Sequence, residues 1–459
     1  MAANKEDLNF DPDLLRDKYR EERDKRLRQD GNEQYQQVEG DFTYFVEDPY
    51  VDKKIEREAI EDEIEVAIIG GGFGGILAAA RLKESGIDNF KIFEKGGDFG
   101  GTWYWNRYPG ASCDIESYIY FPLLEQTKFI PKQKYTNAPE TLEYIGVIAK
   151  KYGLKERAIF QTEITKVSWS DEKKLWNIST NKGDSINAKF VVHSNGPLNR
   201  PKLPAIKGID KYQGHTFHTS RWDYKFTGGN SKGNLNGLKD KKVAIIGTGA
   251  TAVQCIPHLG EAAQELFVFQ RTPSSIDERN NKDTDENWFE SLKPGWHDKR
   301  RENFEGFLTG SLQKEDLVND GWTEIFRTIL GSIRNSAPSK LRFTYWAASA
   351  FFSKNFYRLG FKDYMMEKFV NYVGKENLSN QVEMVDFAKM EKIRARANEV
   401  VKDPETAESL KPYYRQFCKR PCFHDEYLKT YNRENVTLID TNGKGLEKIT
   451  EKGIYFDGK

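Results

Sequence analysis

Two short apolar runs in this chain each lead into a glycine-rich turn and then into a helix-forming segment. The first run covers residues 63–69 and its turn covers residues 70–75. The second run covers residues 241–246 and its turn covers residues 247–252. Short, largely apolar runs of this length, bounded by turn residues, are typical of strands buried in a parallel sheet. The pattern therefore predicts two strand–turn–helix units, widely separated in the sequence.

The first turn has the spacing G-x-G-x-x-G, formed by Gly70, Gly72 and Gly75. Glycines at this spacing permit a tight turn, a close approach of pyrophosphate to the backbone, and close packing of helix on strand. The next predicted strand, residues 89–94, ends in Glu94, nineteen positions after Gly75. A carboxylate at this position binds ribose hydroxyls and repels a 2′-phosphate. The first unit is therefore predicted to bind FAD or NAD.

The second turn has the spacing G-x-G-x-x-A. Its predicted coenzyme-binding residues are Gly247, Thr248, Gly249, Ala250, Thr251, Ala252 and Gln254. The following strand, residues 265–269, is followed by Arg271 and Thr272 where an acid would select NAD. A surface arginine is common, but a guanidinium and a hydroxyl in this register favour a 2′-phosphate. The second unit is therefore predicted to bind NADP.

Other parts of the chain have different patterns. Residues 1–60 are dense in charge and contain a predicted helix with a thin apolar stripe of Leu14, Leu15 and Leu27, which we expect to lie on the body of the protein as a surface helix. Residues 130–200 contain predicted accessory strands. Residues 281–414 lose the strand–helix rhythm and predict helices, which begin near Trp288, Ile325, Tyr345 and Met365.

Composition narrows the classes of protein. A chain of 459 residues is expected to form roughly three domains, at about 150 residues each. Lys plus Arg and Asp plus Glu both number 70, which favours neither nucleic acid nor an anionic membrane as partner. No long apolar run and no signal-like amino terminus is present, and the four cysteines are too few for a disulfide framework, so we expect a cytoplasmic protein. Cys418 and Cys422 lack a second nearby pair, and we predict no metal site.

Three further segments share a resemblance. Residues 100–114 read GGTWYWNRYPGASCD, residues 212–223 read YQGHTFHTSRWD, and residues 419–421 read KRP. Taken singly, they have ordinary explanations: an aromatic loop between domains, packing residues in a linker, and a solvated basic turn. Together, around two dinucleotide turns, they resemble the type I Baeyer–Villiger monooxygenases. The chain departs from the family at Tyr212, where phenylalanine is usual, and at residues 193–195, which read HSN where related flavoproteins carry ATG.

The resemblance implies an α/β fold with two Rossmann-like dinucleotide-binding domains, an inserted helical lobe and a charged helical N-terminal extension. It implies FAD in residues 61–200, NADPH in residues 201–280 and 415–459, and the helical lobe in residues 281–414, after an extension in residues 1–60.

The resemblance also implies roles for individual residues. Residues expected to line the flavin are Thr102, Trp103, Asp114 and Tyr120. Arg420 corresponds to the family's active-site arginine, with Asp114 orienting it, and Lys419 corresponds to a second contact to the 2′-phosphate. His218 and Trp222 would couple the position of NADP to the state of the flavin. Cys113 has no neighbouring cysteine, which argues against a disulfide reductase.

The implied reaction is oxygen insertion beside a ketone carbonyl to give an ester or lactone, with O2 captured by reduced flavin as a C4a-peroxide. Three alternatives share the two turns: a flavin monooxygenase that oxidises sulfides or amines and does not need Arg420, an NADPH-dependent reductase, and a non-catalytic nucleotide-binding relative. The sequence identifies neither the ketone nor the oligomeric state.

The end of the chain predicts a strand at residues 453–456, with Asp457 and Gly458 as a hairpin turn. We expect this strand to be the first arm of a hairpin and to lack its partner. The resemblance implies a further segment that completes the FAD domain, so we expect a fragment that retains FAD weakly and turns over slowly.

Overall fold

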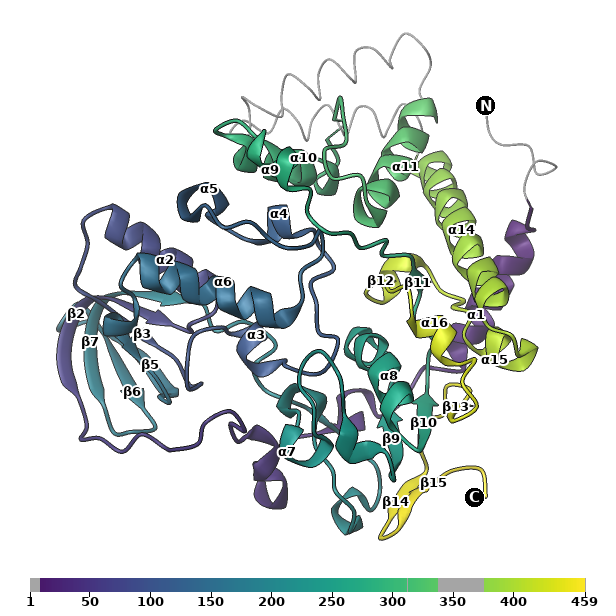
Figure 1. The fold of residues 1–459 in the computed structure, drawn as a ribbon, viewed down its shortest axis with the longest axis horizontal. Helices are drawn as coiled ribbons and strands as arrows, with labels where there is room; N and C mark the ends of the chain where they lie inside the picture. The colour runs from purple at the N-terminus through teal and green to yellow at the C-terminus, as the bar shows by residue number, and fades with distance from the viewer. Residues whose placement is uncertain (1–8, 312, 337–374, 459) are drawn as a thin grey trace. The chain divides into compact units, whose positions relative to one another are not determined.

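The computed structural model describes residues 9–311, 313–336 and 375–458. Figure 1 shows the elements, which belong to two compact units. Unit 1 comprises Met1–Gln29, Asp114–Ile119 and Asp240–Gly445, and unit 2 comprises Asp30–Cys113, Tyr120–Lys239 and Leu446–Lys459. The helices predicted near Tyr345 and Met365 lie outside the described residues.

Unit 2 contains a six-stranded sheet in the order β4-β3-β2-β7-β6-β5. Its strands are β2 (Glu61–Ile69), β3 (Phe90–Phe93), β4 (Ala158–Ile159), β5 (Ile164–Ser170), β6 (Leu175–Thr180) and β7 (Ser185–His193). β2 runs parallel to β3 and β7, and β3 runs parallel to β4, whereas β6 is antiparallel to both β5 and β7. The strands predicted from the apolar runs are confirmed, and the accessory strands extend one edge of the sheet.

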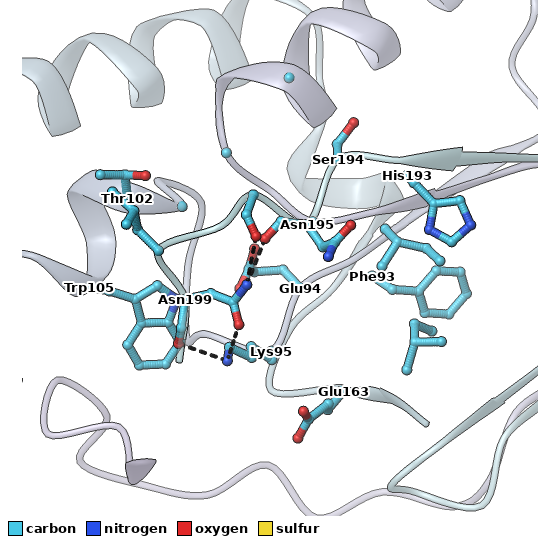
Figure 2. Close-up of a pocket in the computed structure, with 18 of the residues that line it drawn as sticks. Phe93, Glu94, Lys95, Thr102, Trp105, Glu163, His193, Ser194, Asn195 and Asn199 are labelled. Carbon is cyan, nitrogen blue, oxygen red and sulfur yellow. Dashed lines mark hydrogen bonds between the residues drawn. The ribbon is translucent and has the colours of Figure 1, made fainter. Parts of the chain in front are cut away.

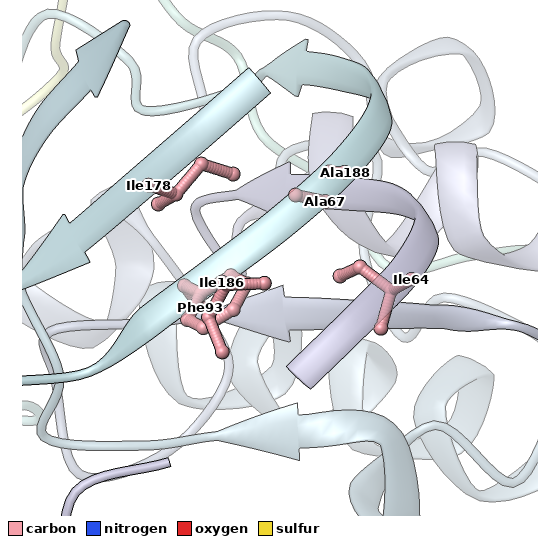
Figure 3. Close-up of a cluster of buried hydrophobic side chains, with 6 residues drawn as sticks. All are labelled: Ile64, Ala67, Phe93, Ile178, Ile186 and Ala188. Carbon is pink, nitrogen blue, oxygen red and sulfur yellow. The ribbon is translucent and has the colours of Figure 1, made fainter. Parts of the chain in front are cut away.

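The core of this sheet follows from its apolar strand positions. Figure 3 shows six side chains that come together from four strands: Ile64, Ala67, Phe93, Ile178, Ile186 and Ala188. Each of them is at most 2% exposed. Burial of such side chains is the main favourable term that holds the sheet together. This core fixes the carboxyl ends of β2 and β3, at which the glycine turn and Glu94 lie.

The remaining elements of unit 2 are helices and short strand pairs. The helices are α2 (Phe73–Glu84), α3 (Thr102–Trp105), α5 (Leu124–Thr127), α6 (Ala138–Lys151) and α7 (Tyr224–Thr227). β1 (Tyr35–Gln36) pairs with β8 (Leu203–Pro204), and β14 (Lys448–Thr450) pairs with β15 (Gly453–Tyr455). In Figure 1, α2 and α6 lie beside the six-stranded sheet.

The expectation for the last strand was wrong in its pairing. Residues 453–455 form the second arm of a hairpin, not an unpaired first arm, because β14 lies directly before them and pairs antiparallel to them. The Asp457 amide donates to Glu447 Oε1 at 2.8 Å, and Asp457 and Gly458 both have positive φ. The Asp-Gly pair is thus a turn, but it follows a hairpin that is already closed.

Unit 1 contains a three-stranded parallel sheet in the order β13-β10-β9, with α8 beside it. The strands of this sheet are β9 (Lys242–Ile246), β10 (Glu265–Gln270) and β13 (Val436–Asp440). A separate pair is formed by β11 (Ile276–Asp277) and β12 (Cys422–Phe423). The helices of unit 1 are α1 (Pro12–Asp24), α4 (Ser117–Tyr120, whose last residue belongs to unit 2), α8 (Ala250–Ala262), α9 (Glu286–Glu290), α10 (Trp296–Leu308), α11 (Gly321–Ser336), α14 (Lys375–Val400), α15 (Pro404–Ser409) and α16 (Tyr427–Thr430).

Helix α1 lies on unit 1, but not through the stripe that the sequence predicted. Leu15 is buried, whereas Leu14 and Leu27 are each 69% exposed. Tyr19 packs against α14, with its ring edge-on to Phe387 and the ring centroids 5.2 Å apart. An aromatic ring on the same helix therefore replaces two of the three leucines as the packing residue.

The two units group the described helices of residues 281–414 with the second sheet. The boundaries of the functional domains stay a prediction. None of the helices in the described ranges has the length and apolar character needed to cross a membrane.

Candidate cofactor sites and active site

A cavity of about 500 Å³ lies in unit 2, at the carboxyl ends of β2, β3 and β7. Figure 2 shows several of its lining residues, which come from segments far apart in the sequence, among them Glu94, Thr102, Trp105 and Ser194. A crevice at the carboxyl ends of parallel strands is where open α/β sheets bind nucleotides. The first glycine turn forms one wall of this cavity.

The glycines of the first turn meet the backbone constraints that the motif predicts. Gly70 has φ of +104°, and a Cβ there would lie 2.5 Å from the carbonyl oxygen of Ser194. A Cβ on Gly75 would lie 1.9 Å from the carbonyl oxygen of Gly70. Gly72 begins α2 and no side chain caps this helix. The amides of the first helical turn are therefore left for a pyrophosphate group.

Glu94 follows β3 directly, and its carboxylate is buried against the turn. Its Oε2 accepts from the Gly71 amide at 2.6 Å, and its Oε1 accepts from the Gly96 amide at 2.7 Å. Burial raises the pKa of Glu94 in spite of these two donors. The carboxylate lines the cavity, where ribose hydroxyls would be its partners.

The aromatic loop supplies another part of the cavity wall, next to the glycine turn. Thr102, Trp103 and Tyr120 all line it, and Trp103 Nε1 donates to the Tyr120 hydroxyl at 2.9 Å. Gly101 has φ of +52°, and a Cβ there would lie 2.7 Å from Gly72 Cα. The loop therefore packs directly on the glycine turn, and flat rings border the space in which a flavin would lie.

The sequence did not single out several residues that line this cavity. Lys95 and Asn199 are hydrogen-bonded to each other in its wall: Lys95 Nζ donates to Asn199 Oδ1 at 2.9 Å and to the Asn199 carbonyl oxygen at 3.0 Å. Glu163 comes from the loop before β5. Ser194 and Asn195, at the departure from ATG, also line it. Among these residues, only Lys95 could have been expected in the cavity wall, because it is next to Glu94 in the sequence.

The second turn, in unit 1, has the same local geometry. Gly247 has φ of +101°, and Gly249 begins α8 without a side-chain cap. A Cβ on Gly249 would have no atom within 4 Å among the described residues. Thr248 is buried, and its hydroxyl donates to the carbonyl oxygen of Thr272 at 2.9 Å. Ala250, Thr251, Ala252 and Gln254 lie in the first turns of α8.

Basic side chains gather where β10 ends. Lys419 Nζ donates to the carbonyl oxygen of Thr272 at 3.0 Å. Burial lowers the pKa of Lys419 to about 8, and repulsion from Arg26 and Arg271 contributes to the shift. The structure thus brings together Arg271, Thr272 and Lys419, which lie far apart in the sequence, and adds Arg26, which the sequence did not indicate.

Arg420 and Asp114 form a bidentate ion pair in unit 1. Arg420 Nη2 donates to Asp114 Oδ1 at 2.7 Å, and its Nε donates to Oδ2 at 3.1 Å. The Asp114 segment is held by helices of the same unit. Trp322 Nε1 of α11 donates to the Asp114 carbonyl oxygen at 3.0 Å, and Arg300 Nη2 of α10 donates to the fully buried Glu116 at 2.9 Å. Asp114 is not among the described residues that line the cavity of unit 2.

His218 and Trp222 lie in unit 2, in a linker packed by its own side chains. His218 Nδ1 is 2.8 Å from the Ser220 hydroxyl, and burial lowers the pKa of His218 to about 4. Trp222 is 2% exposed, and its Nε1 donates to the Thr227 hydroxyl at 3.1 Å. Arg221 lies over the ring of Trp105, 3.9 Å from its centroid. The roles assigned to His218 and Trp222 stay predictions.

The residues present fit both cofactors. In unit 2, an uncapped helix begins at Gly72 beside a cavity with aromatic walls, and Glu94 supplies a carboxylate, which suits FAD. In unit 1, a second uncapped helix begins at Gly249, and cations surround Thr272, which suits a dinucleotide with a 2′-phosphate. Each fit rests on the donor set of its own unit.

Comparison with known proteins gives the same assignment. The family model described as pyridine nucleotide-disulphide oxidoreductase matches residues 67–294. The name of that family includes disulphide oxidoreductases, but Cys113, the cysteine in the aromatic loop, is a buried free thiol. A Baeyer–Villiger monooxygenase of Stachybotrys chlorohalonatus is 50% identical over 455 residues, which cover 99% of this chain and 68% of that protein.

Two solved structures are similar to this one. The polycyclic ketone monooxygenase of Thermothelomyces thermophila superposes with a TM-score of 0.83 at 36% identity, covering 97% of this chain and 70% of that one. A steroid monooxygenase bound to NADP superposes with a TM-score of 0.64 at 28% identity, covering 86% and 68%. With two dinucleotide turns, a cavity suited to a flavin and these similarities, the chain belongs to the Baeyer–Villiger monooxygenases, FAD- and NADPH-dependent enzymes that insert one oxygen atom of O2 beside a ketone carbonyl.

Proposed function

We propose that Arg420 and Asp114 are the active-site pair of this monooxygenase. FAD, when bound and reduced by NADPH, supplies the electrons that activate O2 for insertion into the ketone. Arg420 keeps its positive charge at any working pH, and its guanidinium would stabilise negative charge that develops on oxygen during insertion. The bidentate contact with Asp114, at 2.7 and 3.1 Å, is the observation that carries this proposal.

In this proposal, Asp114 is a positioning residue. Its carboxylate holds the guanidinium of Arg420 in one orientation, and its own segment is fixed by Trp322 and by the Glu116–Arg300 ion pair. Two parallel charge-assisted hydrogen bonds restrict orientation more than a single contact does. Loss of Asp114 should therefore misplace Arg420 without removing its charge.

The test compares product formation with flavin reduction in the holoenzyme. With a cyclic ketone, NADPH and O2, Arg420→Ala should lower ester or lactone formation by about 100-fold or more, the effect of losing a preorganised charge. Reduction of the flavin by NADPH should continue. Arg420→Lys should recover little activity because an ammonium cannot make the bidentate contact.

A matched control separates this effect from a general loss of charge. Arg301→Ala, on α10, removes a half-exposed arginine whose ion pairs are with Asp298 and Glu305 of the same helix. It should leave product formation unchanged. Full lactone formation by Arg420→Ala would move the catalytic role to another residue. If the enzyme formed a sulfoxide from an organic sulfide but no lactone from the ketone, the alternative flavin monooxygenase would be favoured.

We further propose that the substrate is a fused-ring or polycyclic ketone. Support comes from the names of two of the similar structures, a polycyclic ketone monooxygenase and a steroid monooxygenase. A fused bicyclic ketone should give a higher kcat/KM than cyclohexanone. The reverse order would argue for a small-ketone enzyme.

We propose a reducing, cytoplasmic compartment for this protein. Support comes from its cysteines, which are free thiols in the structure, with Cys113, Cys255 and Cys422 buried. The protein should be isolated from its own cells without reductant and then denatured. Thiol titration should then count four free cysteines. A lower count that reductant restores would argue against this compartment.

A further inference from the structure

The N-terminal helix α1 is anchored to unit 1 by specific contacts. Arg16 donates to Glu383 of α14 from Nε at 2.9 Å and from Nη2 at 2.7 Å. Tyr19 packs edge-on against Phe387, and its hydroxyl accepts from Arg394 Nη1 at 3.0 Å. These contacts fix the position of the residues that follow α1.

Arg26 follows α1 by two residues and contacts the chain directly after β10. Its Nε donates to the Thr272 hydroxyl at 3.1 Å and to the Arg271 carbonyl oxygen at 3.3 Å. Next to it, Lys25 lies against the turn after β13, where a Cβ on Gly443 would come within 2.7 Å of the Lys25 carbonyl oxygen. The extension therefore reaches the end of β10, where Arg271 and Thr272 lie.

Glu22 of α1 supplies a carboxylate to Arg26. Arg26 Nη1 contacts the Glu22 carboxylate at 2.5 Å, and although burial opposes ionisation, hydrogen bonds from Arg26, Lys25 and Lys18 lower the pKa of Glu22 to about 2. Glu22 is thus shared among three cations of its own segment. Asp440 also faces Arg26, and burial raises the pKa of Asp440.

Arg26 and Lys419 both contact the segment formed by Arg271 and Thr272, so three cations lie close together there. Lys419 donates to the carbonyl oxygen of Thr272, and Arg26 donates to the hydroxyl of Thr272 and the carbonyl oxygen of Arg271. Like charges this close repel one another, and the shifted pKa of Lys419 reflects that repulsion together with burial. A dianionic group placed among them would relieve the repulsion.

We infer that Arg26 of the N-terminal extension is a third cation for the 2′-phosphate of NADPH and a determinant of coenzyme specificity. This inference rests on the predicted binding of NADPH at Arg271 and Lys419. The extension then acts as a part of the coenzyme site, because α1 holds Arg26 at the end of β10 before the coenzyme arrives.

The test uses nucleotide fragments and needs no turnover. Binding of 2′,5′-ADP, which carries the 2′-phosphate, and of 5′-AMP, which lacks it, is measured by calorimetry on the holoenzyme. Arg26→Ala should weaken 2′,5′-ADP binding about ten-fold, the effect of losing one charge-assisted contact, and leave 5′-AMP binding unchanged. Arg26→Lys should retain part of the preference because it keeps the charge.

The matched control is Arg23→Ala, on α1, because Arg23 is 61% exposed and pairs with the adjacent Asp24. It should change neither affinity. If Arg271→Ala lowers the preference for 2′,5′-ADP and Arg26→Ala does not, the inference about Arg26 fails and the NADPH site stands. If neither Arg271→Ala nor Lys419→Ala affects the preference, the NADPH assignment itself fails. If Arg26→Ala weakened the binding of 2′,5′-ADP and of 5′-AMP equally, Arg26 would have a structural role and the inference would be overturned.

Discussion

Lys419 is a cation whose charge is sensitive to pH. Its pKa of about 8 lies below the ordinary value of a lysine because it is half-buried and near Arg26 and Arg271. The protonated form therefore predominates only below about pH 8, and it is lost as pH rises through that value. A bound 2′-phosphate would favour the protonated form, so NADPH binding should be linked to proton uptake.

We predict that the dissociation constant of NADPH rises above pH 8, by up to about ten-fold per pH unit, whereas that of NADH does not. Fluorescence titration across pH 6.5 to 9.5 measures both. Lys419→Arg should remove the inflection because a guanidinium stays protonated. The same pH profile in wild type and Lys419→Arg would show that another group titrates.

His218 presents the opposite case, a side chain that should not titrate near neutrality. Its pKa of about 4 reflects burial and the nearby charge of Arg221. It is therefore neutral from pH 5 to pH 8. If it couples NADPH to the flavin, it does so as a neutral hydrogen-bonding group, with Nδ1 facing Ser220.

We predict that His218→Ala slows reduction of the flavin by saturating NADPH about ten-fold, the effect of roughly one hydrogen bond. The factor should be the same at pH 6 and pH 8. Stopped-flow absorbance of the flavin measures it. Unchanged kinetics would reduce the linker to packing, and an effect limited to pH 6 would indicate a charged imidazole.

At the scale of elements, the two glycine turns separate a folding role from a binding role. A Cβ on Gly75 would lie 1.9 Å from a carbonyl oxygen of its own turn, so α2 cannot approach β2 with any other residue there. At Gly249 a Cβ meets no described atom within 4 Å, and its φ of −76° suits any residue. Only an approaching coenzyme would meet that Cβ.

We predict that Gly249→Ala keeps the wild-type melting temperature and FAD content but weakens NADPH binding about ten-fold or more. Gly75→Ala should lower both melting temperature and FAD content. Differential scanning fluorimetry, flavin absorbance and NADPH titration distinguish the two. Equal loss of stability in both variants would contradict the separation.

At the scale of the whole molecule, each unit contains one dinucleotide turn. We expect FAD to bind unit 2, which carries the cavity and Glu94, and NADPH to bind unit 1, which carries Arg271 and Lys419. A ligand that binds only the folded state suppresses local opening around its own site. The two cofactors should therefore protect different segments from hydrogen exchange.

We predict that restoring FAD to the apoprotein slows amide exchange in residues 66–76 and 93–105, and that NADP+ slows it in residues 245–254 and 268–273. Exchange followed by mass spectrometry on peptides measures both. Protection of the second turn by FAD alone would reverse the assignment.

Much of the local structure could be predicted from the sequence. The glycines at 70, 72 and 75, the apolar strand before them and Glu94 after the next strand each depend on neighbours close in the chain, and the structure has them in the predicted register. The same holds for the turn at Gly247, because backbone dihedrals and strand periodicity are local properties. The resemblance indicated Arg420 and Asp114 as partners, and their ion pair is present.

The tertiary structure decided the contacts between distant segments. The chain runs from the aromatic loop straight into Asp114, yet Cys113 belongs to unit 2 and Asp114 to unit 1, where Trp322 and Arg420 contact it. Leu14 was expected to pack, but Tyr19 does so, because α14 presents Phe387 to that face of α1.

By itself, the sequence determined the two nucleotide turns, the class of fold and the family, since these depend on short spacings along the chain. The pairing of the last strand with β14 is a contact between neighbouring segments that the sequence interpretation missed. Only the tertiary structure placed Arg26 beside Thr272, a residue 246 positions away. Contacts of that kind depend on which surfaces meet when separate elements pack, and no spacing within one segment encodes that choice.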